Sequence, residues 1–170
     1  MIEIKKHSEL NKIVKDELNQ IIQNEFGHIP IVQETKWAIP DWTIIFYRDS
    51  EIASFYNVVE RVVTIDYRSE LVAGINNVIT TNKFRGKGLS TLTLETTKDF
   101  LFEELKSSLG LLLCADGLIP FYERLDWYKI NCPVYFEQPT ETKLWTANAM
   151  LLTKNYKLEP DKINLNGLPW

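Results

Sequence analysis

The residues best suited to bind a charged ligand lie in one short segment, NVITTNKFRGKGLS, at positions 77–90. A predicted strand ends there and a predicted helix begins at Gly88, with another glycine at Gly86. Backbone N–H groups at a helix start lack helical acceptors and lie at the positive end of the dipole, and glycine lets them approach a ligand closely. The segment carries three basic side chains: Lys83, Arg85 and Lys87. It therefore predicts a phosphate or pyrophosphate site.

Neither of two common phosphate-binding motifs fits this segment. It lacks G-x-x-x-x-G-K-[ST], and G-x-G-x-x-G fails because Thr91 stands in place of the last glycine. The alternative to an anion site is a glycine-containing turn between a strand and a helix, with its basic side chains simply solvated. The residues of this segment, taken alone, leave both interpretations open.

A second segment adds to the interpretation of the first. The letters RGKGLS at positions 85–90 resemble the Q/R-x-x-G-x-G/A signature of the GCN5-related N-acetyltransferase (GNAT) family, and FYERLDW at positions 121–127 resembles that family's F-Y-x-x-x-G-F segment. Both stand in the family's order, with a predicted helix and a predicted buried strand between them. The resemblance covers residues 43–130, with Ser90 in place of glycine or alanine and Asp126 in place of glycine. A long, bent strand, a loop-rich C-terminal part and the terminal Trp170 together loosely resemble the aminoglycoside 2'-N-acetyltransferase branch, although Leu168 and Pro169 stand where that branch has an acidic residue before its last Trp.

The resemblance implies an enzyme that takes acetyl-coenzyme A (acetyl-CoA) as its acyl donor and uses no metal. The strand before the loop would hold the pantetheine arm through the backbone of Val78, Ile79 and Thr80. The loop would bind the pyrophosphate through Arg85, Gly86, Lys87, Gly88, Leu89 and Ser90. The acetyl group would pass directly to a primary amine of a small molecule, such as an amino sugar or a polyamine.

Four residues are candidates for proton transfer. By the resemblance, Tyr122 matches the family's tyrosine acid, which protonates the leaving thiolate, and its other role would be that of a core aromatic. The candidate bases are Glu60, Asp66 and Asp116, which lie in or just after predicted strands. We favour Asp116 because it directly follows the predicted buried strand at 109–115. Carboxylates in such places are mostly solvated, and a chain of water molecules is the alternative base.

Two alternatives to a small-molecule acetyltransferase stay open. One is a non-catalytic acyl-CoA-binding or regulatory domain, which Ser90 and Asp126 fit and Tyr122 argues against. The other is an enzyme that acetylates amines of peptides or proteins. In each case we expect acceptor specificity to come from the loop at 28–41, from a bend near Glu60 and from the C-terminal segment.

The site residues need a scaffold of strands and helices. Apolar residues at alternating or continuous positions predict strands at 2–5, 43–48, 52–66, 71–81, 109–115, 127–130 and 143–152. Apolar residues at helical spacing predict helices from Ser8, as the cap, to Phe26, and at 88–106 and 119–125. Gly27 is placed to end the first helix. The order indicates a single α/β domain over residues 1–170, with a mixed, mostly antiparallel sheet flanked by helices, as in GNAT proteins.

Composition and charge exclude several classes of protein. Hydrophobic residues make up 45% and charged residues 25%, which is ordinary for a globular domain. The net charge of -4 argues against a nucleic-acid partner. The two cysteines and two histidines show no disulfide or metal-ligand spacing, and no apolar run is long enough to span a membrane. We expect a soluble, cytoplasmic protein, and a homodimer stays open.

Overall fold

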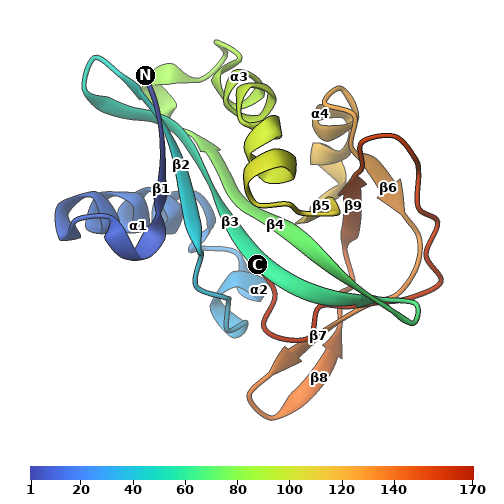
Figure 1. Cartoon of the computed structure of the whole chain (residues 1–170). Coiled ribbons are helices and arrows are strands. Elements are labelled where there is room, and N and C mark those ends of the chain that lie inside the picture. The colour runs from blue at the N-terminus through green and yellow to red at the C-terminus, as the bar shows by residue number, and fades with distance from the viewer.

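Ten strands form one continuous sheet with helices on both of its faces (Figure 1). The computed structural model describes all residues from 1 to 170. The strands are β1 (Ile2–Lys6), β2 (Trp42–Arg48), β3 (Glu51–Ile65), β4 (Arg68–Thr80), β5 (Leu109–Cys114), β6 (Tyr128–Ile130), β7 (Val134–Gln138), β8 (Glu141–Leu144), β9 (Asn148–Leu152) and β10 (Ile163–Asn164). The helices are α1 (Lys12–Phe26), α2 (Pro30–Glu34), α3 (Leu89–Thr96) and α4 (Ile119–Glu123), with the short turns η1 (His7–Glu9), η2 (Asn82–Phe84), η3 (Phe100–Glu104) and η4 (Asp116–Leu118). None of the helices is long and apolar enough to cross a membrane.

The sheet opens between β4 and β5. Strands β1 to β4 run antiparallel to their neighbours, whereas β4 and β5 are parallel and pair only over a short stretch that ends at Ile75 and Leu112. Beyond it both strands continue without pairing to each other. We call this unpaired part, residues 76–80 of β4 and 113–114 of β5, the fork. It leaves one backbone edge of β4 without a strand partner.

A β-bulge in β4 lies at the start of the fork. Between Asn76 and Ile79, β4 has two residues, Asn77 and Val78, opposite a single residue of β3. Asn77 has a φ of 51°, in the left-handed region that asparagine tolerates better than most residues. A bulge bends the strand that carries it, which accounts for the separation of β4 from β5 at this point.

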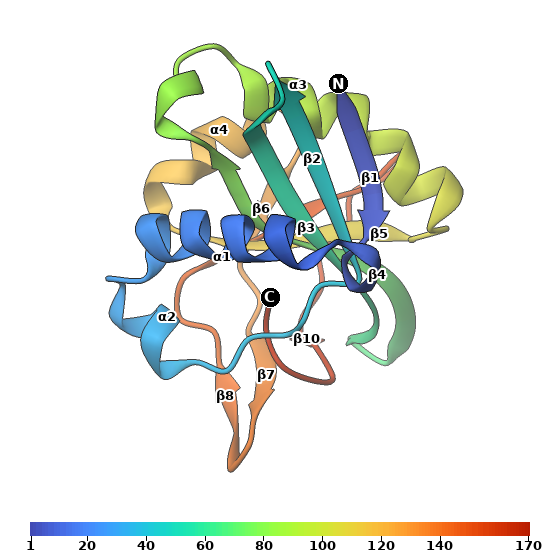
Figure 2. The ribbon, with the colours of Figure 1, turned by 90° about the vertical axis from the view of Figure 1, so that its left-hand side faces the viewer.

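The two faces of the sheet bury different helices. Side chains alternate between the faces along a strand. Tyr56 and Ile75 pack in the cluster under α3, η3 and α4, on what we call the α3 face. Phe55 and Ile79 pack against α1 on the opposite face, which we call the α1 face. Figure 2 shows α1 lying across the strands, and a further cluster on the α1 face contains Trp170.

The predicted fold class is confirmed: the sheet is mixed and mostly antiparallel, with helices on both faces. The first helix begins later than predicted, because Asn11 caps it and Ser8 lies in η1. The Asn11 side-chain oxygen accepts a hydrogen bond from the Val14 N–H at 2.9 Å. Both residue types are good caps, so the sequence pattern alone favoured the wrong one. The helix ends at Gly27 as predicted.

The segment predicted as a helix over 88–106 is helical as far as Glu104, but the helix is interrupted at Thr97 and ends in a π-helical turn, η3. Two predictions about the strands are wrong in part. The strand predicted over 143–152 is two strands, β8 and β9, which pair with different neighbours. The bend or bulge predicted near Glu60 is not a bulge, because β3 stays in regular register with β4 from Asn57 to Ile65. The irregularity of this strand pair lies at the bulge instead.

Candidate functional site

The loop between β4 and α3 has, at two positions, a backbone that glycine adopts most easily. Gly86 has a φ of 73° and Gly88 a φ of 69°. A Cβ built on either glycine would meet no atom within 4 Å. The backbone conformation, and not a lack of space, therefore explains both glycines. Gly88 is also the residue from which α3 starts.

This loop presents a run of free backbone donors. The N–H groups of residues 86–91 donate to no acceptor in the protein, and the next N–H, that of Leu92, donates to the Gly88 carbonyl at 2.9 Å. The free groups surround the positive end of the α3 dipole. Consecutive unpaired donors at a helix start are the usual protein site for a phosphate. The structure thus gives the loop the donors that an anion site requires.

Of the three basic side chains near the loop, one has no carboxylate partner. Lys83 is paired with Glu51 at 2.6 Å, and Arg85 is paired with Glu25 of α1 at 2.5 Å. Lys87 has no carboxylate oxygen within 4 Å. Its side chain is exposed, as is the loop around it. Lys87 therefore supplies the unpaired positive charge beside the free N–H groups.

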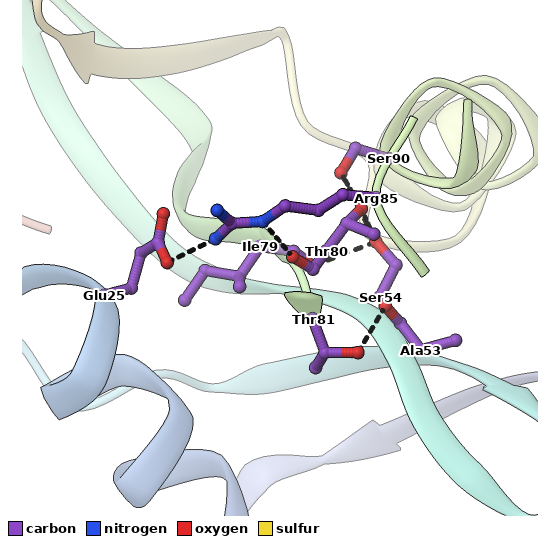
Figure 3. A network of polar contacts seen from close by, with 8 residues as sticks. All are labelled: Glu25, Ala53, Ser54, Ile79, Thr80, Thr81, Arg85 and Ser90. Carbon is purple, nitrogen blue, oxygen red and sulfur yellow. Dashed lines mark hydrogen bonds and ion pairs between the residues drawn. The ribbon is translucent and has the colours of Figure 1, made fainter. Parts of the chain in front are cut away.

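A network of hydrogen bonds ties the loop to the end of β4 (Figure 3). The Arg85 Nε donates to the Thr80 carbonyl at 3.1 Å, so its guanidinium lies along the strand end. The Ser90 and Thr80 hydroxyls are 2.6 Å apart, and Thr80 also donates to the Ser54 hydroxyl at 3.2 Å. Ser54 in turn donates to the Ile79 carbonyl at 3.0 Å. The hydroxyl that distinguishes Ser90 from the family's glycine or alanine is thus bound inside the protein.

The second departure from the family motifs keeps a glycine-like backbone. Asp126 has a φ of 67°, which aspartate tolerates better than most residues. Its carboxylate pairs with Lys98 at 3.1 Å on the surface. The turn after α4 therefore forms without the glycine that the motif usually carries.

The residues expected to contact pantetheine form the fork side of β4. Val78 packs against the cluster of the α3 face, and Ile79 is buried against α1, so the strand is held on both faces. Its edge toward β5 has no partner here. An exposed strand edge is able to pair with another extended chain. The free strand edge is close in sequence to the free N–H groups of the loop, because only Thr81, η2 and Arg85 separate Thr80 from Gly86.

Tyr122 of α4 is buried, yet its hydroxyl has no partner. The side chain is 6% exposed and packs edge-on against Trp127, with the ring centres 6.1 Å apart. The enclosed side-chain oxygens that lack a partner are those of Asn76 and Ser107, so the unpaired Tyr122 hydroxyl keeps contact with solvent. Burial and then the nearby Cys114 raise the pKa of Tyr122. At neutral pH this phenol remains protonated and is free to donate.

Asp116 follows the end of β5 and lines an open pocket of about 700 Å³. The side-chain amide of Asn148 in β9 donates to Asp116 Oδ1 at 2.7 Å and orients the carboxylate. The pocket is also lined by Trp145, whose indole N–H donates to the Asn148 carbonyl at 3.1 Å. The sequence did not point to Asn148, because its place beside Asp116 follows from the pairing of β5 with β9.

The other two predicted bases lie elsewhere. Through the paired registers of β3, β4 and β5, Glu60 is level with Gly110, and the end of β5 is four residues, about 13 Å, further along. Glu60 accepts a hydrogen bond from the Trp42 indole at 3.2 Å. Asp66 closes the β3–β4 turn, where it accepts bonds from two backbone N–H groups of the C-terminal segment. The structure therefore does not bring Glu60 or Asp66 to Asp116.

Comparisons with known proteins identify the fold. No protein-family model and no curated protein match the sequence. Among solved structures, the chain is similar to an acyl-CoA N-acyltransferase from Pseudomonas aeruginosa (TM-score 0.62, 15% identity, covering 90% of this chain and 99% of that one). It is also similar to the GNAT family N-acetyltransferase YhbS from Escherichia coli in complex with CoA (TM-score 0.59, 11% identity, covering 98% of this chain and 89% of that one). A GNAT family acetyltransferase from Brucella melitensis in complex with acetyl-CoA is similar too (TM-score 0.58, 11% identity, covering 96% of this chain and 94% of that one). The chain therefore has the fold of the GCN5-related N-acetyltransferases.

Proposed function

We propose that the protein is an acetyl-CoA-dependent N-acetyltransferase that passes the acetyl group directly to a primary amine of a small molecule. The observation that carries the proposal is the run of unpaired N–H groups at residues 86–91, placed next to the open fork between β4 and β5. A pyrophosphate fits the loop and an extended pantetheine arm fits the strand edge, and CoA contains both. YhbS and the Brucella melitensis acetyltransferase, which share the fold, were solved with CoA and acetyl-CoA.

The acyl donor would be held mainly by backbone groups. The pyrophosphate accepts hydrogen bonds from the free N–H groups of the loop, and Lys87 adds the positive charge that lacks a carboxylate partner. The pantetheine arm lies along Val78, Ile79 and Thr80 as an added strand. Because these contacts use the backbone, they depend on the conformation of the loop and the bulge more than on side-chain identity.

Tyr122 is the proposed acid of the reaction. The amine nitrogen attacks the carbonyl carbon of the acetyl thioester, a C–N bond forms, and the C–S bond breaks. The leaving thiolate takes its proton from the Tyr122 hydroxyl, which burial keeps protonated. Burial also raises the pKa of the neighbouring Cys114 to about 11, so this thiol is a poor nucleophile at neutral pH. Direct transfer is therefore favoured over an acetyl-cysteine intermediate.

Asp116 is the proposed base. Asn148 occupies its Oδ1, while its Oδ2 has no partner in the protein and is available to a ligand in the pocket. The carboxylate removes the proton that the attacking amine loses, directly or through a water molecule. Glu60 is not assigned this role, because its carboxylate is bound to Trp42 and lies further back along the sheet.

The rival function is a regulatory domain that binds acyl-CoA without turnover. Such a domain would keep the loop and the fork, but it would have no use for the unpaired phenol of Tyr122 in α4. The free hydroxyl of Tyr122 therefore favours an enzyme.

Thermal unfolding tests the donor site, with acetyl-CoA, CoA, ATP and buffer compared. At about 100 times its dissociation constant, a ligand adds about 2.7 kcal/mol of stability. For a domain of this size that is a rise of about 5–10 °C in Tm. We expect this rise with acetyl-CoA and CoA. No rise at saturating acetyl-CoA would overturn the proposal, and a rise without acetylation of any amine in a panel would favour the regulatory domain.

The Lys87→Glu variant localises the donor site. Reversing this exposed charge places a carboxylate beside the phosphates and removes the contact of the Lys87 Nζ with the Phe84 ring, 5.4 Å from the ring centre. We expect about tenfold weaker CoA binding by calorimetry, with only a small fall in Tm in the absence of ligand. Lys36→Glu is the matched control, since Lys36 is also exposed and unpaired and lies after α2. Equal losses in both variants would mean that overall charge, and not the loop, governs binding.

A further inference from the structure

A row of polar side chains crosses the α1 face of the sheet and ends at the fork. The His7 Nδ1 is 2.8 Å from the Thr43 hydroxyl, which donates to Asn57 Oδ1 at 2.9 Å. Asn57 is directly opposite Asn76, the first β4 residue of the fork. Thr43 is fully buried and Asn57 is 2% exposed. Polar side chains buried this deeply, between two apolar clusters, call for an explanation.

The direction of these hydrogen bonds is fixed. Thr43 has one hydroxyl hydrogen and gives it to Asn57, so it must accept its second bond from an N–H at His7 Nδ1. Burial and then Lys15 lower the pKa of His7, which keeps the imidazole neutral near pH 7. The row therefore contains no charged group, and it ends in two carboxamides.

The last member of the row has an unsatisfied atom. Asn76 Oδ1 is enclosed and has no hydrogen-bond partner. Its Nδ2 also has none, yet it is not among the enclosed unpaired atoms and so reaches solvent. A carboxamide rotates about its last torsion between two broad wells. A half-turn would bring Oδ1 to the open side and direct Nδ2 toward the Asn57 side chain opposite, where Oδ1 has a spare lone pair.

Asn76 is also well placed for a substrate. It directly follows Ile75, the last β4 residue paired with β5, and it precedes the bulge. On the same face, the Trp170 ring packs against Gly74, two residues earlier on β4. The carboxamide thus stands at the mouth of the fork, next to the strand edge proposed to hold the pantetheine arm.

We propose that Asn76 accepts a hydrogen bond from an uncharged donor of the acceptor, a hydroxyl or an amide N–H, and so determines specificity. The proposal rests on the proposed transferase function. A neutral carboxamide, supported by a neutral row, suits a hydroxylated or amide-bearing amine better than a purely alkyl amine. The acceptor class is therefore an amine with a neutral polar group close to the reacting nitrogen, such as an amino sugar or an amino-acid amide.

Paired amines of matched size test this inference. Ethanolamine and propylamine differ by a hydroxyl in place of a methyl group, and D-glucosamine and glycinamide separate the hydroxyl source from the amide source. We expect the ratio of kcat/KM for ethanolamine to kcat/KM for propylamine to be about fivefold higher in the wild type than in Asn76→Leu, which is close in shape. Fivefold is the worth of one neutral hydrogen bond, and comparing the two proteins cancels the difference in basicity between the two amines.

A stability measurement separates recognition from structure. Asn76→Leu removes an enclosed, unpaired oxygen, so Tm without ligand is expected to hold or rise. Ser107→Ala is the matched control, because Ser107 Oγ is the other enclosed unpaired oxygen and lies before β5, at the end opposite the fork. It should behave like Asn76→Leu in Tm and keep the wild-type amine ratio. Should Asn76→Leu fail to fold, Asn76→Ser, whose hydroxyl is too short to reach, carries the same test.

The outcomes distinguish the two proposals. An unchanged amine ratio in a folded Asn76 variant that still acetylates would overturn the specificity role and leave the transferase intact. A fall in Tm with an unchanged ratio would show that Asn76 is only structural. A wild-type protein that neither binds acetyl-CoA nor acetylates any of the four amines would overturn both proposals.

Discussion

The regions proposed to bind the acyl donor and the acceptor, which we call the donor region and the acceptor region, are built in opposite ways. The donor region is almost contiguous in sequence: residues 77–91 supply the bulge, the strand edge, the two left-handed glycines and the free N–H groups. The acceptor region draws on residues far apart in the chain, from His7 in η1 to Trp170. The register of the β-sheet, and not a local motif, sets which of these residues are neighbours, such as Asn57 and Asn76.

This difference has a physical consequence. Backbone donors of the loop depend on local dihedral angles, which glycine at two positions allows. The acceptor region depends on the pairing of β3 with β4 and of β5 with β9, and on the packing of side chains against one another. Substitutions in the donor region should therefore change ligand affinity more than stability. Substitutions in the acceptor region should change turnover, specificity or stability, and leave CoA binding alone.

The largest effect is expected from Tyr122→Phe, which removes the proposed acid. The hydroxyl has no partner in the protein, so its loss should leave Tm and CoA affinity unchanged. General acid catalysis is typically worth 10²–10⁴-fold, and we expect kcat to fall by about 100-fold. Steady-state kinetics with saturating acetyl-CoA measure this.

Tyr56→Phe is the control for the Tyr122 variant. The Tyr56 hydroxyl is buried and bonded to the Thr97 hydroxyl under α3. Its loss should cost about 1 kcal/mol of stability and leave kcat unchanged. If Tyr122→Phe instead destabilises the fold and keeps its kcat, Tyr122 is a core aromatic and the acid lies elsewhere.

Effects of intermediate size are expected from two glycine substitutions, Gly74→Ala in the acceptor region and Gly88→Ala in the donor region. In Gly74→Ala the new Cβ would collide with the Trp170 ring, and overpacking of this kind costs about 1–3 kcal/mol. In Gly88→Ala the Cβ meets nothing, and the cost of the left-handed backbone is about 1 kcal/mol. Urea unfolding should show the larger loss for Gly74→Ala, and CoA titration the larger loss for Gly88→Ala. The reverse order would mean that the two regions are not separable.

The same contrast explains how much the sequence predicted. Strands β2 to β5, the loop and α4 follow from local patterns, and they were predicted together with the fold class. The Asn76–Asn57 and Asp116–Asn148 neighbours depend on strand pairing between distant segments, which no local period encodes. Strand β10 has two residues, too few for a pattern, and the place of Glu60 level with Gly110 follows from a register that the sequence does not encode locally.

The smallest predicted effect is a pH dependence of the polar row. Burial and Lys15 lower the pKa of His7 below its ordinary value of 6.5. As the pH falls, His7 in the unfolded chain therefore takes up a proton at a higher pH than His7 in the folded protein. The contribution of neutral His7 to the free energy of unfolding is therefore fully present above pH 6.5, and it is lost as the pH falls from there through the lowered pKa. Urea midpoints between pH 7.5 and 5 should fall more steeply in the wild type than in His7→Asn.

The control is His28→Asn, which changes the other histidine. Because His28 lies in the exposed turn before α2, this variant should keep the wild-type slope of the urea midpoint against pH. Equal slopes in the wild type and His7→Asn would remove His7 as the source of the dependence. CoA affinity measured over the same pH range decides whether protonation of the polar row affects the donor loop. Since the row meets β4 only at Asn76 and the loop begins beyond Thr80, we expect that affinity to follow neither histidine substitution. If it follows His7→Asn, protonation at the edge of the acceptor region reaches the donor loop through β4, and the two regions are coupled.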